Sequence, residues 1–157
     1  MWQQLYRKFN KMKESVTYIL LNPDEPAPAC IGSERTPCPM VVIIEAVVSP
    51  QWQGIVSDRI EECGCLYMMA WGIECSSWDD SVDWAQLAAF DFGDIPEENF
   101  LLTTWHEEEP LSEVFDYAKT SANHPTMEIK RTILLHISTQ DKSAELLHAY
   151  ADNSADI

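Results

Sequence analysis

Two short segments carry most of the side chains whose types suit chemistry. His106 and Glu107 follow the apolar run FLLTTW, and Asp79 and Asp80 lie in WGIECSSWDDSVDW. Imidazole and carboxylate groups transfer protons in general acid–base catalysis and ligate zinc, manganese or magnesium. The spacing HEEE differs from HExxH, which places two histidines on one helix face around zinc. The four residues define one alternative function, a small metal-assisted hydrolase or nucleotide-handling enzyme, although the pattern identifies no dedicated metal site and no cofactor.

Nucleophilic catalysis and nucleotide binding have less support. Cys75, Ser76 and Ser77 stand where a nucleophile could lie, with His106 as its base. GIECSSW lacks the flanking glycines of a nucleophile elbow, however, and Ser77 is expected to cap a helix. No GxGxxG motif and no P-loop occur, so the patterns that bind dinucleotides or triphosphates are missing.

The same segments have the composition of a protein-binding surface. In such surfaces tryptophans anchor the partner while carboxylates steer its approach. At least one of Trp71, Trp78 and Trp84 is expected in the core. The residues predicted to contact a partner are Trp78, Asp79, Asp80, Asp83, Glu107, Glu108 and Glu109.

The charge of the chain favours a basic partner. The net charge is -16, from 26 Asp and Glu against 10 Lys and Arg, and residues 60–118 contain no Lys or Arg at all. A field of one sign attracts an oppositely charged protein and disfavours direct binding of nucleic acid. The alternatives are a solvated surface that keeps the protein soluble, and mimicry of DNA by the carboxylates.

The elements that must position these residues alternate between strand and helix. Apolar runs predict strands over 16–21, 40–48, 65–71, 100–105 and 132–137. Helices are expected from Pro50 with Ser49 as cap, from a cap at Ser77, Asp79 or Asp80, from Pro110, and from a cap at Ser138 or Thr139. Gly64 is expected to end the first of them in a left-handed conformation. This order predicts a three-layer, doubly wound, mostly parallel sheet of four or five strands, Rossmann-like or flavodoxin-like.

The chain divides into four parts by composition. Residues 1–21 are expected to form an amphipathic helix over 2–14 and an edge strand, and 22–39 a proline-rich connector. Residues 40–150 form a single α/β domain, and 151–157 a frayed tail. No segment is apolar enough to span a membrane.

Two polar residues interrupt the apolar strands. Glu45 must find a partner or face an edge of the sheet, and it marks either a buried hydrogen bond or a site. His136 is expected to be a core histidine whose hydrogen bonds are satisfied. The sequence does not say what partners they have.

The cysteines indicate a reducing compartment. Their number, five, is odd, and they form no CxxC pair, so packing as reduced thiols in the cytoplasm is expected. The N-terminus lacks the apolar core and cleavage site of a secretory signal.

The stretch from 40 to 138, with CLYMMAWGIECSSWDDSVDW and TTWHEEEP, resembles a small bacterial family known only as a domain of unknown function. The resemblance implies a bacterial cytoplasmic protein and carries no activity or catalytic residues. The function that the sequence favours is a non-enzymatic, acidic interaction module with a basic protein partner. An immunity or inhibitor protein, or an accessory subunit of a bacterial defence system, fits this description.

Overall fold

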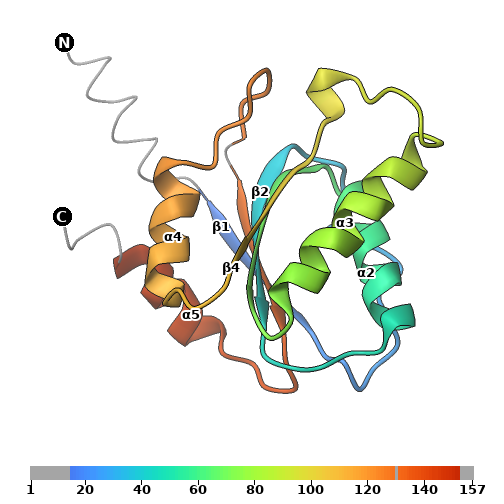
Figure 1. Cartoon of the computed structure of the whole chain (residues 1–157). Helices are drawn as coiled ribbons and strands as arrows, with labels where there is room; N and C mark the ends of the chain where they lie inside the picture. Colours follow the sequence, from blue (N-terminus) through green and yellow to red (C-terminus); the bar gives the residue numbers. More distant parts are fainter. Residues whose placement is uncertain (1–14, 130, 153–157) are drawn as a thin grey trace, which may run out of the picture.

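The computed structural model describes residues 15–129 and 131–152, in which strands and helices alternate (Figure 1). The predicted helix at 2–14 and most of the predicted tail lie outside the described residues. The elements are β1 (Val16–Leu21), β2 (Cys38–Ile44), α2 (Pro50–Glu62), β3 (Cys65–Gly72), α3 (Cys75–Ala89), the short 3-10 helix η1 (Glu97–Asn99), β4 (Leu102–His106), α4 (Leu111–Thr120), β5 (Thr132–Ile137) and α5 (Ser143–Asp152).

The five strands form one sheet in the order β1-β5-β2-β3-β4, and every neighbouring pair is parallel. Helices α2 and α3 cover one face of the sheet, and α4 and α5 cover the other (Figure 1). The predicted three-layer, doubly wound architecture is therefore confirmed. So is the position of β1 at an edge of the sheet.

Strand β2 lies in the middle of the sheet and is buried along its whole length. Its side chains alternate between two cores: Met40 and Val42 face α2 and α3, whereas Val41 and Ile43 face α4. A strand covered on both faces needs apolar residues at every position. This explains the continuous apolar run in the sequence.

The first helix begins and ends as predicted. The Ser49 hydroxyl accepts a hydrogen bond from the Trp52 amide, and Pro50 occupies the first turn of α2. Gly64 has a φ of 94°, and a Cβ there would lie 2.6 Å from the Thr36 carbonyl oxygen. Only glycine fits both the conformation and the close approach of the loop before β2.

Two predicted helix caps are wrong. Helix α3 begins at Cys75, earlier than any predicted cap, and its N-cap residue Glu74 has a φ of 53° and makes no side-chain capping bond. Only two residues separate β3 from α3, so the helix begins before the chain reaches Ser77, Asp79 and Asp80. Helix α5 begins later than predicted, at Ser143, whose amide donates to the Asp141 carboxylate at 2.7 Å.

The sheet has a topological switch between β2 and β5. These strands lie side by side, but β2 leads to α2 on one face and β5 leads to α5 on the other. In open parallel sheets ligands bind beyond the carboxyl ends of strands at such a point. Glu45 and Ser138, the residues that follow the two strands, lie there. None of the described helices combines the length and the apolar character needed to cross a membrane.

Candidate functional site

Three adjacent strands place polar side chains on one face near the switch. Tyr18 of β1, His136 of β5 and Glu45 directly after β2 all lie on the face covered by α4 and α5, because side chains alternate along a strand. His136 lies beside Leu20 of β1 and beside Ile43 of β2. Tyr18 and Glu45 are therefore displaced from His136 by two residues in opposite directions along the strands.

These side chains form a closed ring of hydrogen bonds with Lys142. The Lys142 ammonium donates to Glu45 Oε2 at 3.1 Å, and the Lys142 backbone amide donates to the Tyr18 hydroxyl at 3.2 Å. His136 bonds Glu45 Oε1 through Nε2 and the Tyr18 hydroxyl, 2.6 Å away, through Nδ1. An ionised Glu45 only accepts, so Nε2 carries the proton, Nδ1 of a neutral imidazole accepts, and Tyr18 donates to it. We call these four residues the polar ring.

The charges in the polar ring follow from its contacts. Partial burial acts to raise the pKa of Glu45, but the hydrogen bonds from His136 and Lys142 outweigh it, and the pKa is lowered. The bond to Glu45 raises the pKa of Lys142. Burial raises the pKa of Tyr18 more than the Lys142 amide lowers it. Near pH 7 the ring therefore contains a carboxylate, an ammonium and a neutral phenol around an imidazole that is 0% exposed.

The polar ring has the arrangement of an activated nucleophile. A hydroxyl contacts an imidazole, and a carboxylate orients the imidazole from its other nitrogen. This combination recurs in enzymes that use a base-activated side chain. The sequence pointed to Glu45 and His136, and His136 is confirmed as a buried, hydrogen-bonded histidine. Tyr18 and Lys142 were missed, because nothing in the sequence says that β1 pairs with β5.

Two of the residues predicted to contact a partner are not on the surface. Trp78 is 1% exposed and Asp79 is 5% exposed, so neither offers a surface to a partner. Both lie on the face of α3 that packs against the sheet. Asp80, Glu107, Glu108 and Glu109 are exposed and Asp83 is half-buried, and their role in binding stays a prediction.

The four predicted catalytic residues do not come together. His106 is buried on the α4 face, where Nδ1 contacts Glu109 Oε2 and Nε2 contacts the Thr104 hydroxyl, both at 2.9 Å. Asp79 lies across the sheet on α3. Among the described residues, no group of three His, Cys, Asp or Glu side chains is arranged to hold a metal ion. A metal-assisted hydrolase built on His106, Glu107, Asp79 and Asp80 stays a prediction.

Asp79 is a buried carboxyl group whose hydrogen bonds are incomplete among the described residues. Within the described part of the chain its Oδ1 atom has no hydrogen-bond partner. Burial raises its pKa, and the nearby Asp83 and Asp80 raise it further, whereas a hydrogen bond with Thr103 lowers it. The folded chain thus keeps a proton on Asp79 to higher pH than the unfolded chain does.

We expect Asp79→Asn to raise the free energy of unfolding at pH 7 by about 1 kcal/mol, because it removes a poorly satisfied buried carboxylate. The pKa of Asp79 is about 3.8 in the unfolded chain and higher in the folded chain. Stability therefore falls as pH rises from about 3.8 through the higher pKa of the folded chain, and it stays reduced at all higher pH. The gain from asparagine should therefore vanish below pH 3.8. Urea denaturation at pH 7 and pH 3.5 measures both effects. The exposed Asp80→Asn is the control, and an equal gain there would contradict the argument.

A different surface combines exposed aromatic residues with carboxylates. Trp84 of α3 and Phe92 just after it are each 63% exposed, and their rings meet edge to face with centroids 6.0 Å apart. Three carboxylates lie near the pair in the chain: Asp80 and Asp91 are exposed and Asp83 is half-buried. We call this set the α3 surface: Asp80, Asp83, Trp84, Asp91 and Phe92.

The turn that contains Phe92 has a strained backbone. Asp91 has a φ of 52° and Phe92 a φ of 58°, both in the left-handed region that side chains rarely adopt. The Phe92 amide closes the end of α3 by donating to the Leu87 carbonyl at 2.8 Å. Each such residue costs of order 1–3 kcal/mol. A large aromatic ring is thus held in solvent by a conformation that glycine would adopt more easily.

Among the described residues, the carboxylates of the α3 surface form no ion pair. Within 15–129 and 131–152, no ion pair involves a carboxylate of α3 or of residues 90–98. Helix α3 begins at the carboxyl edge of the sheet, and the segment that follows it lies at the opposite edge (Figure 1), so the surface runs along the helix from Asp80 to Phe92. The acidic face is therefore longer than the strand-end loops that the sequence suggested.

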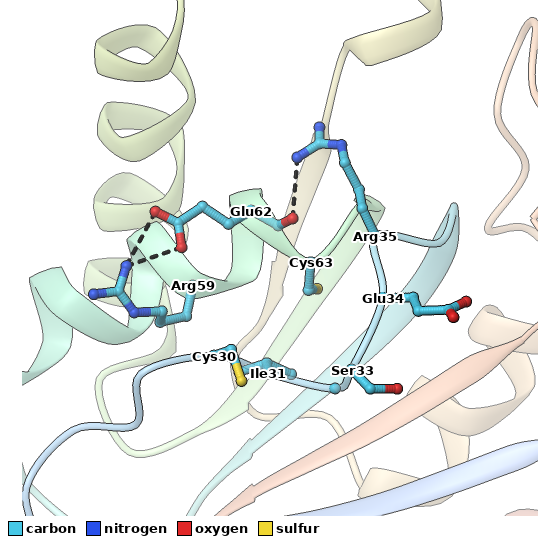
Figure 2. A pocket seen from close by; sticks show the side chains of 9 residues that line it. Cys30, Ile31, Ser33, Glu34, Arg35, Arg59, Glu62 and Cys63 are labelled. Atoms are coloured by element: carbon cyan, nitrogen blue, oxygen red, sulfur yellow. Dashed lines mark hydrogen bonds and ion pairs between the residues drawn. The ribbon is translucent and has the colours of Figure 1, made fainter.

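A small pocket of about 130 Å³ lies where the connector passes the C-terminal end of α2. In Figure 2 the Arg59 guanidinium binds the Glu62 carboxylate, and Arg35 reaches the Glu62 carbonyl oxygen. Arg59 also donates to the Pro28 carbonyl at 3.1 Å. The two arginines therefore hold the connector against α2. The pocket is lined by Cys30, Ile31, Gly32, Ser33, Glu34, Arg35, Arg59, Glu62 and Cys63.

Trp84 and Phe92 were missed as surface residues, although one signal was available for Trp84. Six residues separate it from Trp78, a rotation that puts the two on different sides of a helix. With Trp78 in the core, Trp84 must face away from it. The exposure of Phe92 depends on the left-handed turn at Asp91 and Phe92. Without glycine at these positions, the sequence does not predict this turn.

Comparison with known proteins gives one match. A family model described as "Domain of unknown function (DUF7684)" matches residues 16–153. No curated protein and no solved structure matches the chain. The match extends the resemblance noted for residues 40–138 to β1, the connector and α5.

Proposed function

The chain belongs to the DUF7684 family, whose description assigns no activity, and we propose that it is an acidic interaction module that binds a basic protein through the α3 surface. The observation that carries this proposal is the exposed Trp84–Phe92 pair, close in the chain to carboxylates that form no ion pair among the described residues. Such a surface needs no catalytic residue. It replaces the Trp78-centred patch that the sequence suggested.

The two kinds of side chain have separate roles in binding. Aromatic rings bury a large area at little cost in side-chain entropy, and they dominate the energy of many interfaces. Carboxylates raise the association rate of a cationic partner and make it depend on ionic strength. The strained turn at Asp91 and Phe92 fixes one ring before the partner arrives, which lowers the ordering cost of binding.

The class of partner follows from the charge. A cationic toxin bound by an immunity or inhibitor protein, or a basic subunit bound by an accessory protein of a bacterial defence system, would both fit the α3 surface. Action in the cytoplasm fits the described cysteines, which are all free thiols.

The first experiment is capture of partners on the tagged full chain from a lysate of its native host, at low and at high salt. A stoichiometric basic protein that salt releases is then purified and its affinity is measured. We expect Trp84→Ala to weaken binding about 30-fold, as for the central aromatic residue of an interface. Phe92→Gly should also weaken binding while relieving the backbone strain, so that loss of folding does not explain its effect.

Matched variants separate this surface from general effects of charge and hydrophobicity. Asp80→Lys with Asp91→Lys should weaken binding and reduce its salt dependence. Asp24→Lys with Asp58→Lys changes the net charge equally at exposed positions elsewhere and should have a smaller effect. Val47→Ala alters a residue that is 70% exposed beyond β2. Equal affinities for the Trp84 and Val47 variants would refute the proposal.

A further inference from the structure

We propose that Tyr18 is a nucleophile that accepts an acyl group from a small, neutral ester or thioester, with His136 as its general base and Glu45 as the group that orients the imidazole. This activity is separate from the α3 surface. It arises from the polar ring on the opposite face of the sheet.

The hydrogen bonds supply each part that an activated hydroxyl requires. The Tyr18 hydroxyl lies 2.6 Å from Nδ1 of His136. A neutral imidazole with its proton on Nε2 accepts the hydroxyl proton at Nδ1. Nε2 of His136 donates to Glu45 Oε1, which fixes the tautomer and the ring orientation. Lys142 holds the other oxygen of Glu45 at 3.1 Å. Nδ1 therefore faces the phenol, and Nε2 binds the carboxylate.

His136 and Tyr18 differ in burial. His136 is 0% exposed, whereas Tyr18 is half-buried. Tyr18 is therefore the more accessible of the two residues, and the proposal assigns the attack on the electrophile to its phenol. The Lys142 amide already donates to that oxygen at 3.2 Å, and the same contact would stabilise negative charge as the proton leaves.

The step can be written in full. The Tyr18 oxygen attacks the carbonyl carbon of R–CO–X–R′, and the phenol proton passes to Nδ1 of His136. The ionised Glu45 and Lys142 pair stabilises the imidazolium from the Nε2 side. The C–X bond breaks, the leaving group takes the proton from Nδ1, and the products are Tyr18–O–CO–R and HX–R′. Water, deprotonated by His136, then hydrolyses the aryl ester to restore Tyr18 and release R–COOH.

The electrostatics select an uncharged substrate. The chain has a net charge of -16, and the one ammonium group in the polar ring is already paired with Glu45. An anionic substrate such as a phosphate ester would meet repulsion without a free counterion. A small neutral acyl donor meets neither obstacle.

The chain contains its own comparison groups. The hydroxyls of Tyr67 and Tyr117 bond to each other, and the hydroxyl of Tyr150 donates to Thr132. A second hydroxyl–imidazole–carboxylate chain links Thr104, His106 and Glu109. Its hydroxyl is aliphatic, and a phenol loses its proton far more readily. Tyr18 is therefore expected to react before Thr104. Burial raises the pKa of Tyr18, so its expected advantage over Tyr67 and Tyr117 rests on the contact of its hydroxyl with His136.

The test is acetylation of the full chain by p-nitrophenyl acetate, followed by release of nitrophenolate and by mass spectrometry of the peptides. We expect Tyr18 to be acetylated at least tenfold faster than Tyr117 or Tyr150, and Tyr18→Phe to abolish this fast phase. Glu45→Gln keeps an oxygen for Nε2–H but loses the charge that stabilises imidazolium, so the Tyr18 rate should fall about tenfold.

Glu109→Gln is the matched control, because it changes the carboxylate on the other histidine and should leave the Tyr18 rate unchanged. Circular dichroism establishes that each variant is folded. If Tyr18→Phe does not fold, the comparison of Glu45→Gln with Glu109→Gln still decides the question. Acetyl groups spread evenly over the tyrosines, or equal Tyr18 rates in the two glutamine variants, would overturn the proposal.

Discussion

Replacing His136 with alanine is expected to lower the free energy of unfolding by about 4 kcal/mol. The substitution opens a cavity at a position that is 0% exposed, and cavities of this kind cost about 2–5 kcal/mol. It also removes the acceptor of the Tyr18 hydroxyl and one donor to Glu45. Because Tyr18 is half-buried and the side chain of Glu45 is 33% exposed, these two lost bonds add only about 1 kcal/mol. Urea denaturation at pH 7 measures the change.

His148→Ala is the matched control, because the side chain of His148 is 76% exposed and pairs with Asp152 on the surface. Its removal should change the free energy of unfolding by less than about 0.5 kcal/mol. A loss below about 1 kcal/mol for His136→Ala would show that the polar ring contributes little to the fold.

The polar ring should also make stability depend on pH. The pKa of Glu45 is lower in the folded chain than its ordinary value of 4.5. The unfolded chain therefore binds the proton first as pH falls. The stabilisation from Glu45 is complete above about pH 4.5 and is lost as pH drops through the lowered native value. Glu45→Gln should flatten this part of the stability profile.

The fold could be predicted because each element carries its own signal. The sequence shows β2 as an unbroken apolar run and α2 as a helix with Ser49, Pro50 and Gly64 at its ends. These features depend on local sterics and on burial, which neighbouring residues report. The starts of α3 and α5 were wrong because they depend on connection geometry. Glu74 enters α3 in a left-handed conformation, and α5 begins at Ser143 rather than directly after Ser138 or Thr139.

The candidate sites were less predictable because they depend on strand order and on side-chain direction. Glu45 and His136 are 91 residues apart, and only the insertion of β5 between β1 and β2 makes them neighbours. A parallel sheet can be wound in several orders, and composition does not choose among them. His106 and Asp79 follow neighbouring strands, yet lie on opposite faces of the sheet. Their closeness in the predicted topology did not bring their side chains together.

The second large effect is expected at Gly72, where replacement by alanine should lower the free energy of unfolding by about 4 kcal/mol. Gly72 ends β3 with a φ of 106°, which strains any residue with a Cβ. A Cβ there would lie 2.2 Å from the Ile44 carbonyl oxygen, which also accepts the Ile73 amide at 2.9 Å. Neither backbone group can withdraw without separating the ends of β2 and β3. Steric and conformational terms of this size place the variant among the severe ones.

Gly54→Ala provides the opposite result in the same chain. Gly54 lies inside α2, and a Cβ there would have no heavy atom within 4 Å apart from its chain neighbours and the backbone of its own helix. Alanine has the higher helix propensity, so this variant should gain about 1 kcal/mol. Urea denaturation with an unchanged m-value would measure both variants. Similar stabilities for the two alanine variants would mean that the close approach at Gly72 does not constrain the fold.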